Sequence, residues 1–228
     1  MVKSAGGESL AMKVYEELRF EILNGSIEPG ARLKPAEIGR EMGVSLSVTR
    51  EALGMLSAKG LVRIDRNRGF HVTTLSLDAL ASLTFARVIN EGAALRLSLE
   101  RGDLTWESEV LAAHHRLASL PMFLPDQPEV RNEVWAQAHM AFHHALIQAC
   151  GNDVLLDICD RLSDAAELYR AWSGRAGVEV GRDVAAEHKG LLDAALDHDA
   201  DLAVRRFEEH VTRTQQVLLA SGLADAES

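Results

Sequence analysis

Apolar side chains recur with a helical period at the start of the chain. Within residues 9–24 they stand four positions apart, at Leu10, Val14, Leu18 and Ile22. This spacing places them on one face of a helix and predicts an amphipathic helix over this segment. Asn24 and Gly25 follow the last apolar position and mark the end of the helix.

Two further helices are predicted before residue 61. Pro35 suits the first position of a short helix that ends near Gly43, where a tight turn is expected. Ser45 or Ser47 can cap the next helix, which carries apolar residues on one face and closes at Gly60. Two helices joined by such a turn are typical of a helix-turn-helix.

The pattern changes to short β-prone runs after residue 60. Residues 61–64 and 70–73 are rich in β-branched and aromatic side chains, and the polar stretch 65–69 separates them. We expect a hairpin with a basic tip, placed as a wing beside the helix-turn-helix.

From residue 76 onward the chain is rich in alanine and leucine and has few β-branched runs. Periodicity and cap signals predict helices near residues 76–100, 105–119, 129–150, 152–173, 179–197 and 199–221. The expected fold is therefore mainly α: a winged helix-turn-helix domain over residues 1–75 and an all-α antiparallel helical bundle over residues 76–228.

Charge is distributed unevenly between these two parts. The formal net charge is −10, but residues 1–75 hold 11 Lys and Arg against 9 Asp and Glu, while the remainder holds 13 against 25. The stretch 46–68 is locally basic, as a surface that faces DNA phosphates should be. The sequence shows neither a signal peptide nor an apolar run of the roughly 20 residues that a membrane span needs, so we expect a cytoplasmic protein with no membrane partner.

Candidate DNA contacts lie on the third helix and on the wing. The N-terminal residues of a recognition helix reach base edges in the major groove, while flanking basic groups hold phosphates. Arg50 could contact a guanine edge or a phosphate, unless an ordinary helix ion pair holds it. The basic residues of the wing could enter the minor groove, or be solvated turn charges. The predicted DNA-binding residues are Ser45, Leu46, Ser47, Arg50, Arg66, Arg68, Gly69 and His71.

These N-terminal motifs resemble the winged helix-turn-helix of the GntR superfamily of bacterial transcription regulators. The resemblance covers about residues 10–74 and is carried by residues 27–33, 37–45, 50–56 and 60–62. The chain departs from the family pattern at Leu46, where an arginine is usual, and at Val48, where proline or threonine is frequent. Without a cation at position 46, apolar contact with thymine methyl groups becomes available there.

Histidines are the candidate chemistry of the helical part. His139 and His143 are four positions apart and project from one face of a predicted helix, and His188 and His210 lie on two later predicted helices. Imidazoles from neighbouring helices of a bundle could complete a divalent metal site. The alternative from spacing alone is a set of helix histidines that bind no metal.

Residues 76–221 resemble the FCD effector domain of the FadR subfamily within the GntR superfamily. The resemblance rests on residues 87–94, on Phe142-His143 followed by Gly151-Asn152, and on Glu187-His188 with Glu208-Glu209-His210. Metal-binding members of this family use an aspartate four positions before the Phe-His histidine, that histidine, and two later ones. The resemblance thus implies His143, His188 and His210 as ligands, and His139 stands where the aspartate would be.

The resemblance also implies a homodimer, and an open coordination position on the ion would take a carboxylate oxygen of a small organic acid as effector. Four neutral imidazoles would leave the full charge of a divalent ion in place, which should attract anions. Arg87 is the candidate for a second contact to the effector, and the alternative is a structural ion pair with Glu91 at i+4. All-imidazole ligation suits zinc, with nickel also possible.

The resulting prediction is a ligand-responsive DNA-binding regulator, a repressor that a carboxylate effector bound at the metal site releases from double-stranded operator DNA. The alternative is a regulator for which the metal ion itself is the signal. We do not expect an enzyme, because Met140 follows His139 where a zincin motif needs glutamate, and no nucleophile accompanies the histidines.

Overall fold

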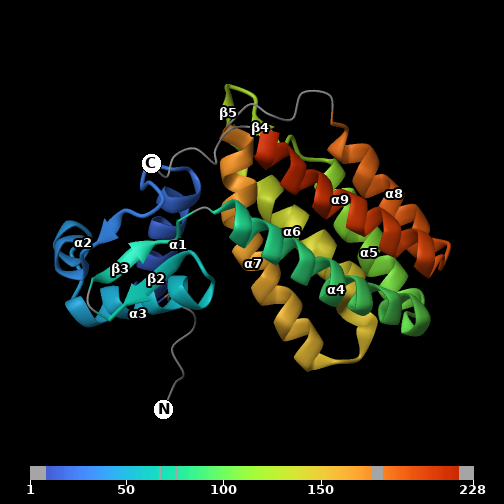
Figure 1. The fold of residues 1–228 in the computed structure, drawn as a ribbon, viewed down its shortest axis with the longest axis horizontal. Coiled ribbons are helices and arrows are strands. Elements are labelled where there is room, and N and C mark those ends of the chain that lie inside the picture. The colour runs from blue at the N-terminus through green and yellow to red at the C-terminus, as the bar shows by residue number, and fades with distance from the viewer. Residues whose placement is uncertain (1–8, 67, 75, 176–181, 221–228) are drawn as a thin grey trace, which may run out of the picture. The chain divides into compact units, whose positions relative to one another are not determined.

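A computed structural model describes residues 9–66, 68–74, 76–175 and 182–220. The chain divides into two compact units, residues 1–75 and 76–228, each with its own set of elements (Figure 1). Position 67 in the predicted wing, residues 179–181 of one predicted helix and residue 221 of another lie outside the described residues.

The N-terminal unit begins with α1 (Leu10–Leu23), the helix that the four-residue spacing predicts. Ser9 caps it, since its side chain accepts a hydrogen bond from the Met12 amide at 3.1 Å. Three of the four periodic residues are buried, and Leu10 in the first turn is exposed.

Helices α2 (Pro35–Glu41) and α3 (Leu46–Ala58) form the predicted helix-turn-helix. Pro35 occupies the start of α2, and Gly43 between the helices has a φ of +66°, a backbone conformation that glycine adopts without strain. On α3 the inward-facing residues are fully buried, namely Ala52, Leu53 and Leu56. This apolar face fixes α3 against α1 and leaves its other face open.

The wing is one edge of a small antiparallel sheet. Strands β2 (Val62–Asp65) and β3 (Gly69–Val72) form the predicted hairpin. A short strand that periodicity did not predict, β1 (Arg32–Leu33), pairs with the other edge of β3, so the strand order is β1-β3-β2. Two residues are too few for an alternating pattern to appear in the sequence.

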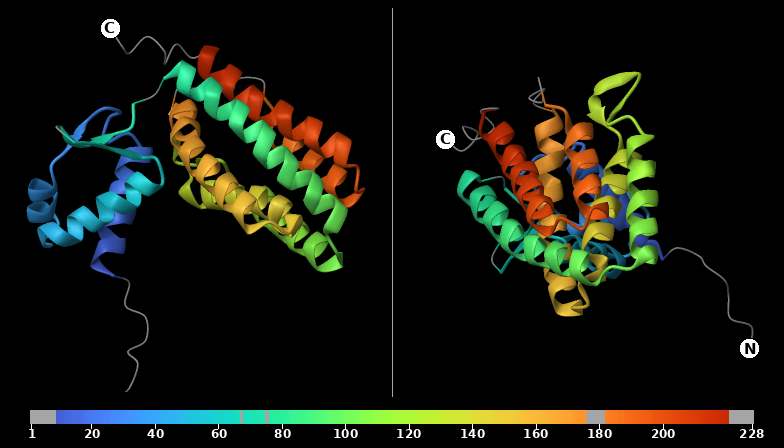
Figure 2. Two further views of the ribbon diagram at one scale, coloured as in Figure 1. Left: turned by 60° about the horizontal axis from the view of Figure 1, so that its bottom comes forward. Right: turned by 90° about the vertical axis from the view of Figure 1, so that its right-hand side faces the viewer.

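The C-terminal unit is a helical bundle, seen from two further directions in Figure 2. Its helices are α4 (Leu77–Arg101), α5 (Leu104–Ala118), α6 (Glu133–Ile147), α7 (Asp153–Arg175), α8 (Val184–Leu196) and α9 (Ala200–Ala220). A single 3-10 turn, Gln148–Cys150, follows α6. Helices α4 and α9 lie side by side and run antiparallel, and α8 packs against both α9 and α5.

This unit is not entirely helical, which corrects one detail of the prediction. Strands β4 (Phe123–Leu124) and β5 (Gln127–Arg131) form an antiparallel hairpin before α6. The expected helix start at residue 129 is therefore wrong, and α6 begins at Glu133 behind the cap Asn132, whose side chain accepts from the Val134 amide at 3.0 Å. No helix among the described residues has the length and apolarity that crossing a membrane requires.

Candidate functional site

Four histidines from three helices meet in the interior of the C-terminal unit. They are His139 and His143 on α6, His188 on α8 and His210 on α9, and all four are buried. One ring nitrogen of each lies within 4.8 Å of the corresponding nitrogens of the other three. The structure thus brings together all four residues that the sequence indicated as metal ligands.

Helix periodicity and ring packing set the arrangement of the cluster. His139 and His143 are one turn apart on the buried face of α6, and their Nε2 atoms are 3.1 Å apart. Trp135, one turn before His139, stacks on the His139 ring with 5.0 Å between ring centroids. On the other side, His143 stacks on His210 at 5.1 Å and His188 lies 4.8 Å from His210.

The environment keeps these imidazoles uncharged. Burial, with the neighbouring histidines as a second cause, lowers the pKa of His139 and His143 well below the ordinary value for imidazole. Burial also lowers the pKa of His188, to about 2, and that of His210 despite the adjacent carboxylate of Glu187. Neutral imidazole is the form that binds a divalent metal ion.

Several ring nitrogens of the cluster have no hydrogen-bond partner in the part of the chain that the structure describes. Within the described residues, Nδ1 of His139, Nδ1 of His143 and Nε2 of His188 are buried without a hydrogen-bond partner. Leaving a buried polar atom unpaired costs roughly 1–3 kcal/mol, so the unpaired Nε2 of His188 calls for a partner such as a bound ion. The Nδ1 atoms of His139 and His143 point away from their Nε2 atoms, which are 3.1 Å apart, so an ion held by those Nε2 atoms would not satisfy them. A tetrahedral zinc ion holds its nitrogen ligands about 3.3 Å apart, so the cluster needs little closure to reach that spacing.

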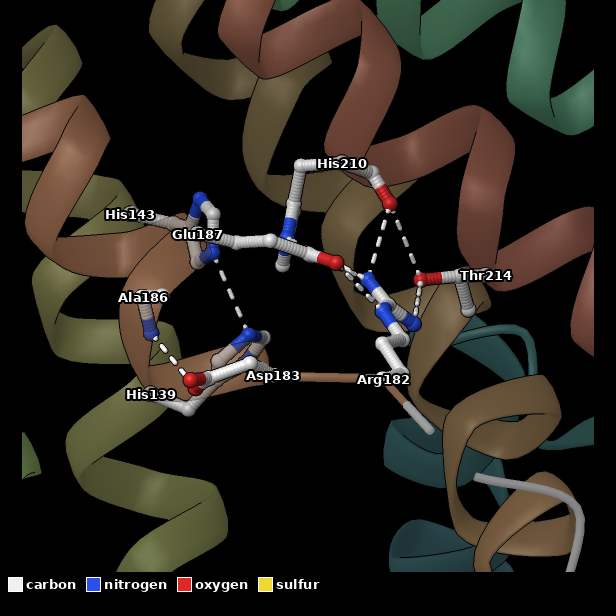
Figure 3. Close-up of polar contacts among 8 residues, drawn as sticks. All are labelled: His139, His143, Arg182, Asp183, Ala186, Glu187, His210 and Thr214. Atoms are coloured by element: carbon white, nitrogen blue, oxygen red, sulfur yellow. Dashed lines mark hydrogen bonds and ion pairs between the residues drawn. The ribbon is translucent and has the colours of Figure 1, made fainter. Parts of the chain in front are cut away.

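The carboxylate of Glu187, which the sequence marked only as part of the Glu187-His188 motif, supports His210. Glu187, one residue before His188 on α8, accepts a hydrogen bond on Oε2 from Nδ1 of His210 at 2.7 Å (Figure 3). Arg182 donates to both oxygens of the same carboxylate, at 2.8 and 2.6 Å. Although burial raises the pKa of Glu187, its hydrogen bonds with Arg182 and His210 outweigh that effect and lower it to about 2.

Two more buried ionic groups occur in this unit. Arg87 and Glu91 form a two-bond ion pair along α4, with Nε to Oε1 at 2.6 Å and Nη2 to Oε2 at 3.0 Å. This is the helix pair that the sequence left open as the alternative for Arg87. The carboxylate of Glu167 on α7 accepts from Arg131 at 2.9 Å and from Arg170 at 2.8 and 3.0 Å, a network that the sequence did not indicate.

The predicted DNA-reading residues lie at the start of α3. Ser45 is its N-cap and Ser47 follows, with 2.9 Å between their hydroxyl oxygens. Leu46 is 48% exposed, and Arg50 one turn later is exposed as well. Of the ion pairs found in the described part of the chain, none involves Arg50, so its charge faces solvent.

The wing residues occupy the turn between β2 and β3 and the start of β3. Arg66 and Arg68 are exposed, and the Arg68 amide donates to the Asp65 side chain at 3.2 Å. Gly69 has a φ of +86°, which shapes the tight turn. His71 is half-buried on β3, opposite Arg32 and Arg63 of the flanking strands.

A winged helix-turn-helix joined to a helical domain with a buried histidine cluster defines a class of two-domain DNA-binding regulators. Family models confirm this organisation: residues 10–72 match the model described as "Bacterial regulatory proteins, gntR family", and residues 82–213 match the FCD domain. The chain belongs to the GntR family of transcription regulators, in the FadR subfamily that carries an FCD domain.

Two relatives that align with most of the chain are also named as transcription regulators. The uncharacterized HTH-type transcriptional regulator BphR of Paraburkholderia xenovorans (strain LB400) is 34% identical over 97% of this chain and 90% of its own length. The HTH-type transcriptional repressor GlaR of Escherichia coli (strain K12) is 31% identical over 86% of this chain and 90% of its own. These relatives are regulators, which confirms that the chain is a regulator and not an enzyme.

A solved structure confirms the fold. Escherichia coli McbR/YncC superimposes with a TM-score of 0.72 at 19% identity, covering 94% of this chain and 99% of that one. At this identity the likeness concerns the fold alone.

Proposed function

We propose that this protein is a metal-dependent, ligand-responsive repressor that a small carboxylate releases from operator DNA. The observation that carries the proposal is the convergence of four buried, neutral histidines from α6, α8 and α9. The relative GlaR is named as a repressor, which supports the direction of regulation.

His139, His143, His188 and His210 would hold the ion, with zinc as the first candidate and nickel as the second. When bound, a divalent ion supplies a positive charge that can hold a carboxylate oxygen in a site closed to bulk water. The protein contributes orientation, because the ligands stand on three packed helices and His139 is held against Trp135.

Arg87 remains the proposed second contact for the effector. Its guanidinium is buried beside Glu91 and lies 5.9 Å from the centroid of the Phe207 ring on α9. A carboxylate near the histidines would find this cation in the same bundle, since both His143 and His210 interact electrostatically with Arg87. The ion pair with Glu91 would keep the guanidinium oriented until the effector arrives.

At the DNA, the N-terminal turn of α3 would enter the major groove, with Ser45, Ser47 and Arg50 at its tip and Leu46 against thymine methyl groups. Arg66, Arg68, Gly69 and His71 would contact the backbone or the minor groove from the wing. We further propose a homodimer, because two such units read the two halves of a two-fold operator. Effector binding would then change the separation of the two DNA-reading units.

The proposal is tested by operator binding under defined metal and effector conditions. An operator is first selected from random double-stranded DNA with the zinc-loaded protein, and its affinity is measured by fluorescence anisotropy at fixed salt. We expect one or more small carboxylates to weaken binding of the zinc-loaded protein by at least about tenfold, the size of a common allosteric coupling. His143→Ala should bind the same DNA and lose this response. If no member of a broad carboxylate panel has any effect, the effector proposal is wrong.

A second candidate function has one observation in its favour. With four imidazole donors from the protein, a tetrahedral ion would have all its positions filled, as in closed zinc sites. In that case the ion itself is the signal. The two functions differ in one result: a metal sensor changes its operator affinity when zinc alone is added to the chelator-treated protein, with no organic acid present.

A further inference from the structure

We propose that Arg182 and Glu187 are positioning residues that keep a proton on Nδ1 of His210 and so present the lone pair of its Nε2 to the other three histidines. This inference deepens the proposed function, since it concerns the metal site and rests on that site being one. It assigns a role to Arg182, which no sequence pattern indicated, and to Glu187, which the sequence marked only as part of the Glu187-His188 motif.

The carboxylate of Glu187 is held as an ionised acceptor. Arg182 donates through Nε to Oε1 at 2.8 Å and through Nη2 to Oε2 at 2.6 Å, a two-bond fork that matches the planar geometry of both groups. The Arg182 side chain is 4% exposed and that of Glu187 is 25% exposed, so the pair is largely shielded from water. Both carboxylate oxygens therefore carry lone pairs and no proton.

The contact with the ring then determines which nitrogen of His210 is protonated. Oε2 of Glu187 lies 2.7 Å from Nδ1 of His210, a distance at which two acceptors would repel each other. Nδ1 must therefore be the donor, and in a neutral imidazole the lone pair is then on Nε2. Nη2 of Arg182 is further away, at 3.3 Å from Nδ1, and donates to the carbonyl oxygen of His210 at 3.1 Å instead.

The same residues join the two helices that carry the later histidines. Arg182 stands just before α8 and donates to Thr214 Oγ1 on α9 at 3.1 Å as well as to the His210 carbonyl (Figure 3). Next to it, Asp183 caps α8 by accepting from the Ala186 amide at 2.8 Å. The guanidinium thus ties the start of α8 to α9, which fixes the spacing between His188 and His210.

This support is specific to one of the four rings. Within the described residues, the outward ring nitrogens of His139 and His143 have no hydrogen-bond acceptor, whereas His210 has a carboxylate. A carboxylate behind a ligating histidine fixes the tautomer and raises the basicity of the ring, and its loss typically weakens metal binding by about 10–100-fold. The affinity of the cluster should therefore depend on Glu187 although Glu187 is not a ligand.

The test compares the full-length protein with the variants Glu187→Ala, Glu187→Gln and Arg182→Ala. A matched control is Asp193→Asn, which removes an exposed carboxylate on the same helix, where it pairs with Lys189. In the metal-free protein, nitrogen NMR of ¹⁵N-histidine identifies the tautomer of His210, assigned with His210→Gln. Zinc affinity is measured by competition with a chelator, and the ligand field is followed through the absorption spectrum of bound Co²⁺.

We expect the Nδ1–H tautomer at His210 in the unaltered protein and a mixture of tautomers in Glu187→Ala. Zinc affinity should fall by about 10–100-fold in Glu187→Ala and Arg182→Ala, and less in Glu187→Gln, whose amide oxygen can still accept from Nδ1–H. Asp193→Asn should stay within twofold of the unaltered protein. If Glu187→Ala does not fold, the smaller loss in Glu187→Gln carries the test.

An Nε2–H tautomer or an imidazolium at His210 in the unaltered metal-free protein would overturn the inference. So would unchanged zinc affinity and Co²⁺ spectrum in folded Glu187→Ala. The metal site and the tautomer of His210 are tested separately. If the unaltered protein binds no zinc, the proposed metal site is wrong, and the NMR measurement still decides whether Arg182 and Glu187 set the tautomer.

Discussion

His139 is the position at which this chain departs from the metal-binding proteins that it resembles, which carry an aspartate there. Its ring is packed between Trp135 and His143, with its Nε2 3.1 Å from that of His143. An aspartate is shorter and charged, so the change alters both the packing and the charge of the cluster. With histidine at this position, the ligands would leave the full charge of a bound divalent ion uncompensated.

Replacing His139 by aspartate should therefore reduce the attraction of the site for anions. We expect His139→Asp to keep a bound divalent ion and to weaken binding of a simple carboxylate probe, such as succinate, by at least about tenfold. One added negative charge at about 4 Å costs about 4 kcal/mol at an effective dielectric constant of about 20, which exceeds the roughly 1.4 kcal/mol of a tenfold change. Calorimetric titration of the zinc-loaded protein measures this. His115→Asp, the same substitution at an exposed site, should leave carboxylate binding unchanged. Equal succinate affinity in His139→Asp and the unaltered protein would contradict the charge argument.

The sequence predicted which residues form the cluster better than it predicted what the residues around the cluster do. Of the nine histidines, these four were indicated because His139 and His143 are four positions apart and because three of the four match a family pattern. No role was predicted for Arg182, or for Glu187 beyond its place in the Glu187-His188 motif, because their contacts form only where the start of α8 meets α9. Arg87 was assigned two alternatives, and the ion pair with Glu91 is the one visible in the structure.

At the scale of elements, α3 is the helix that we propose presents side chains to DNA. Its buried face packs on α1, and its first turn carries an exposed leucine in the place of a usual cation. Arg50 is consequently the exposed cation nearest to the start of the helix.

Arg50→Ala should lower operator affinity by roughly tenfold, the effect of losing one base or phosphate contact, and reduce the salt slope by about one if the contact is to a phosphate. Anisotropy titrations at several salt concentrations measure both. Arg96→Ala, on α4 in the other unit, is the matched control and should leave the affinity unchanged. If Arg50→Ala behaves like this control, α3 is not the DNA-reading helix.

A histidine at the corner between α8 and α9 gives the C-terminal unit a pH-dependent contact. Nε2 of His198 lies 2.8 Å from Glu107 on α5, and its Nδ1 contacts the Leu99 carbonyl at 2.9 Å. The hydrogen bonds with Glu107 and with the Leu99 carbonyl raise the pKa of His198 above 6.5. Protonated His198 thus favours the folded state.

A raised pKa in the folded state means that the stabilisation is complete below pH 6.5 and is lost as the pH rises through the folded-state value. Because the pair is exposed, its contribution should be less than about 1 kcal/mol. We expect His198→Asn to lower the free energy of unfolding at pH 6 and to have a smaller effect at pH 8, in urea titrations with chelator present. Asparagine is chosen because residue 198 has a φ of +52°. An effect that grows with pH would show that His198 acts in its neutral form.

Long periodic elements were predictable and short pairings were not. The apolar spacing located α1 and α3 and the bundle helices, because each buries a continuous face. The strand β1 and the hairpin β4–β5 were not predicted. The two-residue strands and β5, which contains Pro128, show no alternation of apolar and polar residues. Their position depends on the partner strand rather than on their own pattern.

At the scale of the whole molecule, the difference in charge between the two units agrees with the role proposed for each. Residues 1–75, with their slight positive excess, form the unit that carries the proposed DNA-reading helix, and the strongly acidic remainder contains the histidine cluster. The chain as a whole is a GntR-family regulator, and the proposed signal enters through the second unit. The central claim is therefore that carboxylate binding depends on a metal held by the histidines.

Thermal unfolding with a panel of small carboxylates, measured on the zinc-loaded and on the chelator-treated protein, tests this claim most directly. A carboxylate that binds the loaded site should raise Tm by several degrees at about 100 times its Kd, which corresponds to roughly 2.7 kcal/mol. The same compound should have no effect after chelation or on zinc-treated His143→Ala. Equal stabilisation with and without metal would contradict the account.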